Sequence, residues 1–351
     1  MSIITSLLVL SFLIFFHELG HFIVAKFFGV AVEVFSIGFG KKILRKKMGN
    51  TEYCLSMIPL GGYVQMKGQD DTDPTKISLD ADSYNTKRPW QRIIILFAGP
   101  FANFLLAFFL YIAIGNMGVT KLLPTIGAIS KDSPALMSGL QKGDKILSIN
   151  DTPIKTWDEL SNKIKNSQGI LLLDIERQHQ KQQIKIMPKI HRYKNIFGES
   201  LQKKMVGIAP IGAVTVLKLS CPQSINYAVG ATKQATMMIV KSLQKLIEGV
   251  IPAKDLGGIV SIVQVTAEAS KIGLVALFGL TALISVNLGV LNLLPIPALD
   301  GGHIMFNIYE MITKKAPSEK VLYYLTLTGW VLLLSLMAFT IFNDIYRIMG
   351  E

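Results

Sequence analysis

The sequence predicts an α-helical membrane protein with four transmembrane helices and a mixed β/α domain inserted between the second and third. The first observation is composition: half of the 351 residues are hydrophobic and 17% are charged, whereas soluble chains carry about 25% charge. The second is a mean hydropathy of +0.42. The third is that apolar residues gather into long runs. Together they exclude a disordered chain and disfavour an ordinary soluble enzyme.

Four apolar runs are long enough to cross a bilayer. A helix of about 23 residues, at about 1.5 Å per residue, spans roughly 34 Å and exceeds a hydrocarbon core of about 30 Å. The first run is expected to stay in the mature protein, because no basic residue precedes Lys26 and no Ala-x-Ala site follows the run. The expected spans are residues 3–25, 93–115, 274–294 and 321–342.

Basic residues in the short loops predict which side of the membrane those loops face. Because cytoplasmic loops are enriched in lysine and arginine, the loops between spans one and two and between spans three and four are expected in the cytoplasm. The long insert and both termini are then expected outside it. The residues behind this prediction are Lys41, Lys42, Arg45, Lys46, Lys47, Lys87, Arg88, Arg92, Lys314 and Lys315.

The net charge of +12 is explained mostly by this loop bias. No basic patch lies among stacking aromatic residues in a recognisable nucleic-acid module, so no nucleic-acid partner is expected. The two cysteines, Cys54 and Cys221, allow neither a disulfide framework nor zinc-finger spacing.

The first span contains His17-Glu18-Leu19-Gly20-His21, a His-Glu-x-x-His pattern. Histidines at positions i and i+4 share one helical face and can hold one zinc ion, with the glutamate beside the metal. A charged group at membrane depth costs about 2 to 3 kcal/mol or more, so such groups usually face a protein interior and have a task. A hydrogen-bonded cluster that only joins helices is the structural alternative.

A third zinc ligand is expected far along the chain, because catalytic zinc usually has three protein ligands and one open position. Asp300 is the candidate. It follows Pro295 and Pro297, which are expected to break the third span, and precedes two glycines that are expected to relax the backbone. His303 remains a competing ligand.

The mechanism expected from these residues is hydrolysis. Zinc would lower the pKa of its bound water from about 16 toward 7, and Glu18 would take the proton and later pass it to the leaving amine. A tetrahedral oxyanion also needs donors, and Asn287 and Asn292 are expected to be the only amides near that depth. Interhelical packing explains these two asparagines equally well.

Four motifs resemble the site-2 protease family of intramembrane zinc metalloproteases, in particular the bacterial regulator-of-sigma-E protease type, over nearly the whole chain. They are Phe16-His-Glu-Leu-Gly-His-Phe22, Gly61-Gly-Tyr-Val-Gln-Met-Lys-Gly68, Ala98-Gly-Pro-Phe-Ala-Asn103 and Asn287-Leu-Gly-Val-Leu-Asn-Leu-Leu-Pro-Ile-Pro-Ala-Leu-Asp-Gly-Gly-His303.

The resemblance implies specific roles for residues in these motifs and a location in the bacterial inner membrane. It implies a zinc cofactor held by His17, His21 and Asp300, with Glu18 as the catalytic acid and base. It also implies that a further group of residues shapes the path of the substrate. These are Asn287, Asn292, Pro295 and Pro297.

The segment between the first two spans is expected to form short β-hairpins, because residues 32–39 and 52–66 alternate apolar and polar side chains. The family counterpart is a membrane-associated β-loop beside the active site, where an open strand edge would pair with an unwound substrate. A surface hairpin without a role is the alternative. The basic run 41–47 is expected to contact anionic lipid.

The insert resembles a PDZ domain, mainly in residues 126–150, with further strands expected at 170–177 and 183–187. One such unit is visible, whereas the best-known members of the family have two. The alternative is a steric cap without a ligand. Beyond it, residues 223–251 are expected to form an external helix near the membrane surface.

PDZ folds hold a chain end in a groove as an added strand. The resemblance places Val206, Gly207 and Ile208 along that groove. Further on, Leu256-Gly-Gly-Ile259 stands where the family often has Gly-Pro, and the sequence does not indicate what the missing proline changes.

The predicted function is an intramembrane zinc metalloendopeptidase that cuts single-span membrane proteins within or near their transmembrane segment. The resemblance implies pre-cleaved anti-sigma factors or leftover signal peptides as substrates. The alternatives are a membrane-anchored PDZ scaffold without proteolytic activity, which would not need Glu18, and a metal transporter, which would ordinarily show a helix repeat.

This prediction divides the chain into eight segments. They are 1–30 (first span and zinc motif), 31–88 (β-loop region), 89–116 (second span), 117–212 (PDZ domain), 213–272 (interfacial helical segment), 273–303 (third span and third ligand), 304–320 (cytoplasmic loop) and 321–351 (fourth span and tail).

Overall fold

The computed structural model describes residues 2–69, 78–195 and 199–350. Four stretches lie outside the described residues: residue 1 in the expected first-span segment, 70–77 in the expected β-loop region, 196–198 in the insert and 351 in the expected tail. The chain divides into two compact units. We call Met1–Ile114 with Pro222–Glu351 the membrane unit, and Gly115–Cys221 the inserted unit.

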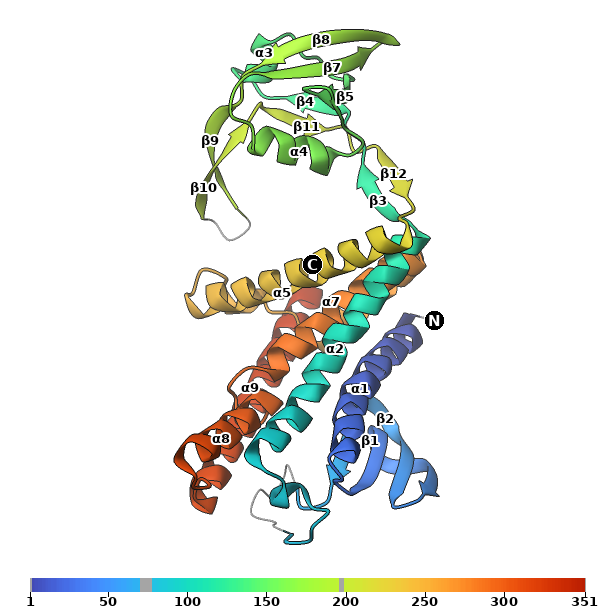
Figure 1. The fold of residues 1–351 in the computed structure, drawn as a ribbon, viewed down its shortest axis with the longest axis vertical. Helices are drawn as coiled ribbons and strands as arrows, with labels where there is room; N and C mark the ends of the chain where they lie inside the picture. The colour runs from blue at the N-terminus through green and yellow to red at the C-terminus, as the bar shows by residue number, and fades with distance from the viewer. Residues whose placement is uncertain (1, 70–77, 196–198, 351) are drawn as a thin grey trace. The chain divides into compact units, whose positions relative to one another are not determined.

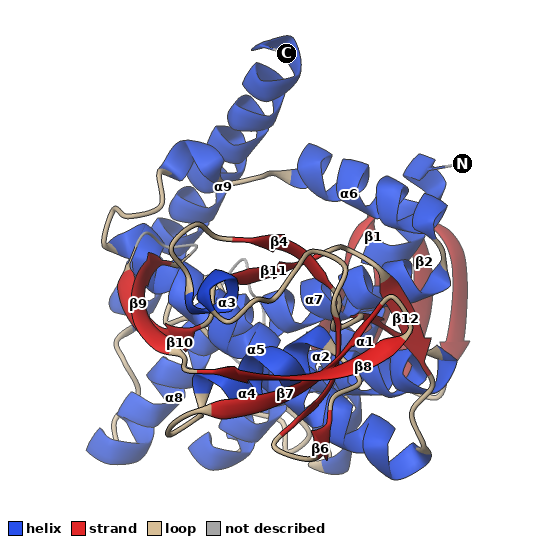
Figure 2. Cartoon of the chain, turned by 90° about the horizontal axis from the view of Figure 1, so that it is seen from above, coloured by secondary structure: helices blue, strands red, loops and turns tan. Residues whose placement is uncertain are grey.

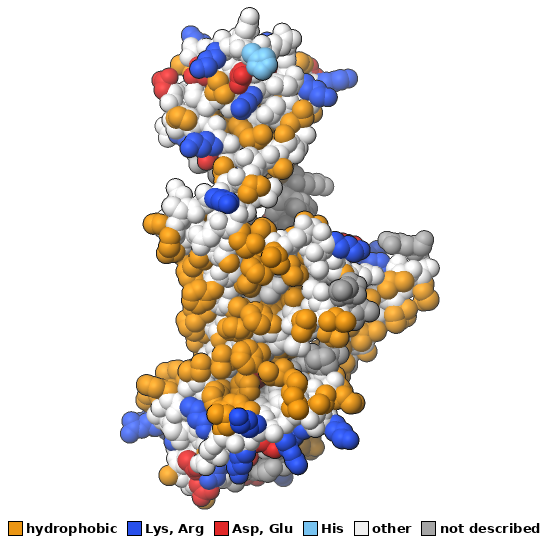
Figure 3. All heavy atoms as spheres, turned by 90° about the vertical axis from the view of Figure 1, so that its right-hand side faces the viewer, with side chains coloured by type: hydrophobic (Ala, Val, Ile, Leu, Met, Phe, Trp, Pro, Cys, Tyr) orange, Lys and Arg blue, Asp and Glu red, His pale blue; other side chains and the backbone are white. Residues whose placement is uncertain are grey.

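The predicted class, an α-helical protein with four spans, is confirmed. The helices long and apolar enough to cross a membrane, within the described residues, are α1 (Ser2–Phe27), α2 (Pro89–Met117), α7 (Leu274–Asn292) and α9 (Glu319–Gly350). Figure 1 shows α1, α2 and α7 running alongside one another. Hydrophobic side chains cover the visible face of these helices, and lysine and arginine gather at the lower end of the unit (Figure 3).

Further helices complete the membrane unit: α5 (Cys221–Ile247), α6 (Ile259–Ile272), α8 (Asp300–Thr313) and the 3₁₀ turns η1 (Tyr84–Thr86) and η2 (Ala253–Asp255). The helix α6 packs on α1, where the Ser6 hydroxyl donates to the Val263 carbonyl at 3.2 Å. At the start of α6, Asp344 of α9 accepts hydrogen bonds from the backbone N–H groups of Gly258, Val260 and Ser261. A proline at position 258 would lack the first of these donors.

The strands β1 (Val32–Met48) and β2 (Thr51–Met66) form the sheet of the membrane unit. The strand β1 runs beyond the expected 32–39 and includes the basic run 41–47. Its first part is covered on both edges, since Val34 pairs with both Gln65 and Glu52. The chain bends at Gly38, whose φ of +90° and closeness to the Ile58 carbonyl both require glycine.

The third span ends at Asn292, and a separate helix, α8, begins at Asp300. Two prolines without N–H groups lie in the seven-residue break. The expectation that the glycines after Asp300 relax the backbone is wrong, because both are helical. They are needed for close approach: a Cβ at Gly301 would lie 2.3 Å from the Leu294 carbonyl oxygen, and one at Gly302 would lie 2.3 Å from that of Ile296.

The inserted unit is a β-rich domain with two short helices, α3 (Pro134–Met137) and α4 (Trp157–Lys165). Its largest sheet has the order β6-β5-β7-β8, formed by Thr152–Pro153, Lys145–Ile149, Leu171–Arg177 and Gln180–Ile186. The long paired strands β7 and β8 are visible in Figure 2.

Three smaller strand pairs complete the inserted unit. They are β3 (Val119–Leu122) with β12 (Val214–Leu217), β4 (Ile126–Ile129) with β11 (Ile208–Pro210), and β9 (Lys189–Lys194) with β10 (Ser200–Met205). The core of the unit contains Ile126, Leu160, Leu173 and Ile175, all with no exposed surface. The unit therefore has its own hydrophobic core, as a separate domain needs.

Candidate metal centre

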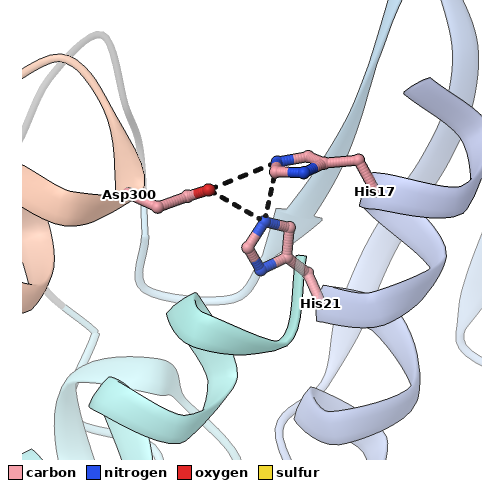
Figure 4. A group of neighbouring side chains, drawn as sticks. All are labelled: His17, His21 and Asp300. Carbon is pink, nitrogen blue, oxygen red and sulfur yellow. Dashed lines mark hydrogen bonds and ion pairs between the residues drawn. The ribbon is translucent and has the colours of Figure 1, made fainter. Parts of the chain in front are cut away.

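Three side chains from two distant parts of the chain converge inside the membrane unit (Figure 4). His17 and His21 lie one turn apart on α1, and Asp300 is the first residue of α8. The distance from His17 Nε2 to Asp300 Oδ2 is 3.2 Å, from His21 Nε2 to the same oxygen 3.5 Å, and between the two Nε2 atoms 3.2 Å. The structure thus places the Asp300 carboxylate beside the two histidine rings.

This arrangement fits a zinc ion. Zinc bonds of about 2.0–2.1 Å in tetrahedral geometry place neighbouring donor atoms about 3.3–3.4 Å apart, and the three observed distances lie close to that spacing. Asp300 Oδ2 is also buried without a hydrogen-bond donor among the described residues. A buried carboxylate oxygen is costly unless a cation or donor meets it, and a metal ion supplies the missing charge.

His21 is held in the correct orientation by α2. Its Nδ1 lies 2.9 Å from the Ile95 carbonyl oxygen, and because a carbonyl only accepts, Nδ1 carries the hydrogen and Nε2 keeps its lone pair for a metal.

Two glycines allow α1 and α2 to approach at this level. A Cβ at Gly20 would lie 2.2 Å from the Ala98 carbonyl oxygen, and a Cβ at Gly99 would lie 2.2 Å from His21 Nε2. Any side chain at Gly99 would therefore occupy the space of the ligand itself. The sequence indicated the glycines but not this steric reason.

A cavity of about 250 Å³ lies next to the three side chains. Glu18 lines it together with His17 and Asp300, and Asn292 reaches into the same space with its Nδ2 3.3 Å from His17 Nε2. Gly61 and Gly62 of β2 also line it. The cavity thus contains candidate ligands, a candidate general base, an amide donor and a strand segment.

The structure does not bring every expected residue to this cavity. Asn287 is half-buried on α7 and is absent from the described lining, and His303 packs its ring against Phe306 on α8 instead of facing the histidines. Pro295 and Pro297 lie in the break between α7 and α8, so their part is to place the residues that follow.

Asn103 on α2 is the residue that the sequence analysis missed. Its amide lies 3.2 Å from His17 Nδ1, and it lines the cavity. The expectation that Asn287 and Asn292 are the only amides near that depth is therefore wrong. The signal was available, because Asn103 is the one amide in the expected span 93–115.

In the inserted unit, Val206, Gly207 and Ile208 line a pocket of about 110 Å³. The pocket also has Trp157, Leu160 and Ile164 of α4 in its wall. The three residues expected along a groove therefore lie side by side facing one helix.

Comparison with known proteins gives matches over both units. The model of peptidase family M50 matches residues 5–336. A candidate zinc metalloprotease of Campylobacter jejuni is 49% identical over 348 residues, covering 99% of this chain and 94% of the relative. One of Helicobacter pylori is 42% identical over 352 residues, covering 99% of each chain. The zinc metalloprotease RasP of Bacillus licheniformis is 28% identical over 429 residues, again covering 99% of each.

Proposed function

We propose that this chain cuts single-span membrane proteins within or near their transmembrane segment. The premise is that the chain belongs to peptidase family M50, the site-2 protease family of zinc metalloproteases. One observation carries the proposal: His17, His21 and Asp300 present three ligand atoms at zinc spacing beside a cavity that His17, Asp300 and Glu18 line. The two histidines and Glu18 belong to α1, which can cross a membrane, and Asp300 begins the helix that follows the spanning helix α7 after a seven-residue break.

The side chains around the cavity have complementary roles in this proposal. Bound zinc supplies Lewis-acid chemistry, by which water becomes a nucleophile near neutral pH and a carbonyl is polarised. Glu18 accepts the proton of the attacking water and returns it to the leaving amine. The Asn292 amide donates to the oxyanion that forms on the substrate carbonyl.

The strand β2 is proposed to hold the substrate in an extended form. A peptide bond inside a helix is hydrogen-bonded and shielded, so the substrate must unwind before it is cut. Gly61 and Gly62 support this role, because they line the cavity, and a Cβ at Gly62 would lie 3.4 Å from Glu18 Cγ. An extended substrate pairs there through main-chain hydrogen bonds.

The inserted unit is proposed to be a PDZ domain outside the cytoplasm that filters substrates or binds a chain end. The pocket beside Val206, Gly207 and Ile208 supports a groove between α4 and β11. The basic residues of the short loops support a cytoplasmic position for the β1–β2 sheet. Trimmed anti-sigma factors and signal-peptide remnants fit such a filter, because both are short outside the membrane.

Cleavage of a tagged single-span substrate by the full-length protein in detergent tests the proposal. Wild type with zinc is expected to cut it, and Glu18→Gln is expected to lower the rate about 10²- to 10⁴-fold while keeping its zinc, as loss of a general base does. The matched control is Glu268→Gln, because Glu268 is an exposed acid on α6 outside the cavity lining. Unchanged cleavage by Glu18→Gln would contradict the mechanism.

A further inference from the structure

Asn103 has a buried contact with a zinc ligand that the mechanism above does not use. Its side chain has no exposed surface, and the amide end that faces His17 Nδ1 at 3.2 Å is Nδ2. Its other end, Oδ1, is buried and has no hydrogen-bond partner among the described residues. A buried amide oxygen without a donor costs about 1–3 kcal/mol, so this orientation of the Asn103 amide is energetically unfavourable.

The chemistry of His17 decides which end of the amide belongs there. His17 Nε2 faces Asp300 Oδ2 and His21 Nε2, so it must offer a lone pair if it is to bind zinc. A neutral imidazole then carries its hydrogen on Nδ1, and that N–H needs an acceptor. The two ends of an asparagine amide have nearly the same shape, so its hydrogen-bond partners decide its orientation.

We propose that Asn103 Oδ1 accepts a hydrogen bond from the Nδ1–H of His17 and so makes Asn103 the residue that positions this zinc ligand. Turning the amide by half a turn pairs Oδ1 with the His17 Nδ1–H and moves the Nδ2 group to the position that Oδ1 has now. Partners of this kind fix the tautomer and ring orientation of metal-bound histidines. The inference rests on the proposed function, because it requires His17 to be a zinc ligand.

The backbone around Asn103 is itself held in place. The Ser285 hydroxyl of α7 donates to the Asn103 carbonyl at 2.8 Å, and both groups are buried. The same helix, α2, supplies the Ile95 carbonyl to His21. Both histidines of α1 are thus oriented from α2, one through a main-chain group and the other through a side chain that mutation can change.

A rival role for Asn103 is a packing contact between helices, in which Nδ2 donates to His17 Nδ1. The two roles predict opposite results for one conservative change. In Asn103→Asp the side chain keeps an acceptor and loses the donor, whereas in Asn103→Leu it keeps the same branching and loses both.

Metal binding by the full-length protein in detergent separates the roles. Zinc affinity is measured by competition with a chelator, and the visible spectrum of the Co²⁺-loaded protein reports the geometry of the ligands. We expect Asn103→Asp to stay close to wild type in both, and Asn103→Leu to bind zinc about 10- to 100-fold more weakly. The control is Asn343→Leu, which removes a buried amide that bonds the Ala253 carbonyl and should leave zinc affinity unchanged.

Three results would overturn the inference: equal losses in Asn103→Asp and Asn103→Leu, wild-type affinity in Asn103→Leu, or an equal loss in the Asn343→Leu control. If Asn103→Leu does not purify as a folded protein, Asn103→Ala takes its place with the same expected loss. A wild type that binds zinc but cuts no substrate would contradict the proposed function and leave this inference standing, since affinity and spectrum need no cleavage.

Discussion

The two units differ in how far they bury apolar side chains. The membrane unit exposes large apolar residues such as Leu8 and Phe109, at 66% and 60%, and fully buries Asn103 and Ser285. The inserted unit instead packs a cluster of large apolar residues, including Ile146, Leu160 and Leu173, with no exposed surface, although others such as Met137 and Ile190 are 70% and 67% exposed. In lipid, the hydrophobic effect does not drive the burial of apolar surface, and polar groups must form hydrogen bonds inside the protein. The interior of the membrane unit therefore includes buried polar side chains, among which a metal site can be built.

The contrast extends to the buried carboxylates. Asp144 in the inserted unit has its own cation, because Arg177 donates to it at 2.7 and 2.8 Å, and the Gln141 N–H adds a third hydrogen bond at 2.8 Å. The Asp144 carboxylate in turn raises the pKa of the Arg177 guanidinium. Asp300 faces two histidines instead. A carboxylate paired with an arginine within the protein supports the fold, whereas one that faces two candidate metal ligands is suited to an external cation.

The largest expected effect concerns Asp300. In Asp300→Asn the site loses a ligand and the charge that balances zinc, so zinc affinity should fall by more than about 100-fold, beyond the effect of losing a supporting contact. Zinc content after dialysis measures this. His303→Ala is the control and should keep its zinc. Zinc retained by Asp300→Asn and lost by His303→Ala would show that His303 is the third ligand.

Gly99 should be the next most sensitive position. In Gly99→Ala the added Cβ would meet His21 Nε2 at 2.2 Å, so we expect zinc affinity to fall about 10- to 100-fold, as for a disturbed ligand orientation. The matched control is Gly230→Ala on α5, where a Cβ meets nothing within 4 Å. Full zinc affinity in Gly99→Ala would show that α1 and α2 can separate at low cost.

The ion pair of the inserted unit should affect stability and not metal binding. Asp144→Asn leaves Arg177 without its counter-ion and should destabilise this unit by about 3–5 kcal/mol. Hydrogen exchange of β5 and β7 in the full-length protein measures the loss. Lys121→Met, which removes the exposed pair with Asp158, should cost under about 1 kcal/mol. Loss of zinc in Asp144→Asn would contradict the expectation that this ion pair does not affect metal binding.

The smallest expected effect concerns Asp344, which caps α6 from α9. Asp344→Ala leaves backbone donors at the start of α6 without their acceptor, so we expect a loss of about 1–3 kcal/mol. The readout is faster amide exchange at Val260 and Ser261, with Glu268→Ala as the control on the exposed face of the same helix. Unchanged exchange would show that water replaces the carboxylate there.

Local sequence features predicted the parts of this protein that depend on neighbours along the chain. The apolar runs indicated the spans, and the spacing of His17 and His21 placed both rings on one face of α1. The full length of β1 was missed, because its second half is rich in lysine and arginine and gains strand structure from pairing with β2. Asn103 was missed because its partner is 86 positions away.

By itself the sequence determined the membrane class and the metal-binding pattern of α1, because periodicity and composition act over a few residues. The tertiary structure alone decided that Asp300 and not His303 meets the histidines, that Gly99 must lack a side chain, and that α2 orients both rings. These facts depend on how closely helices cross, and crossing distance is set by side chains far apart in the chain.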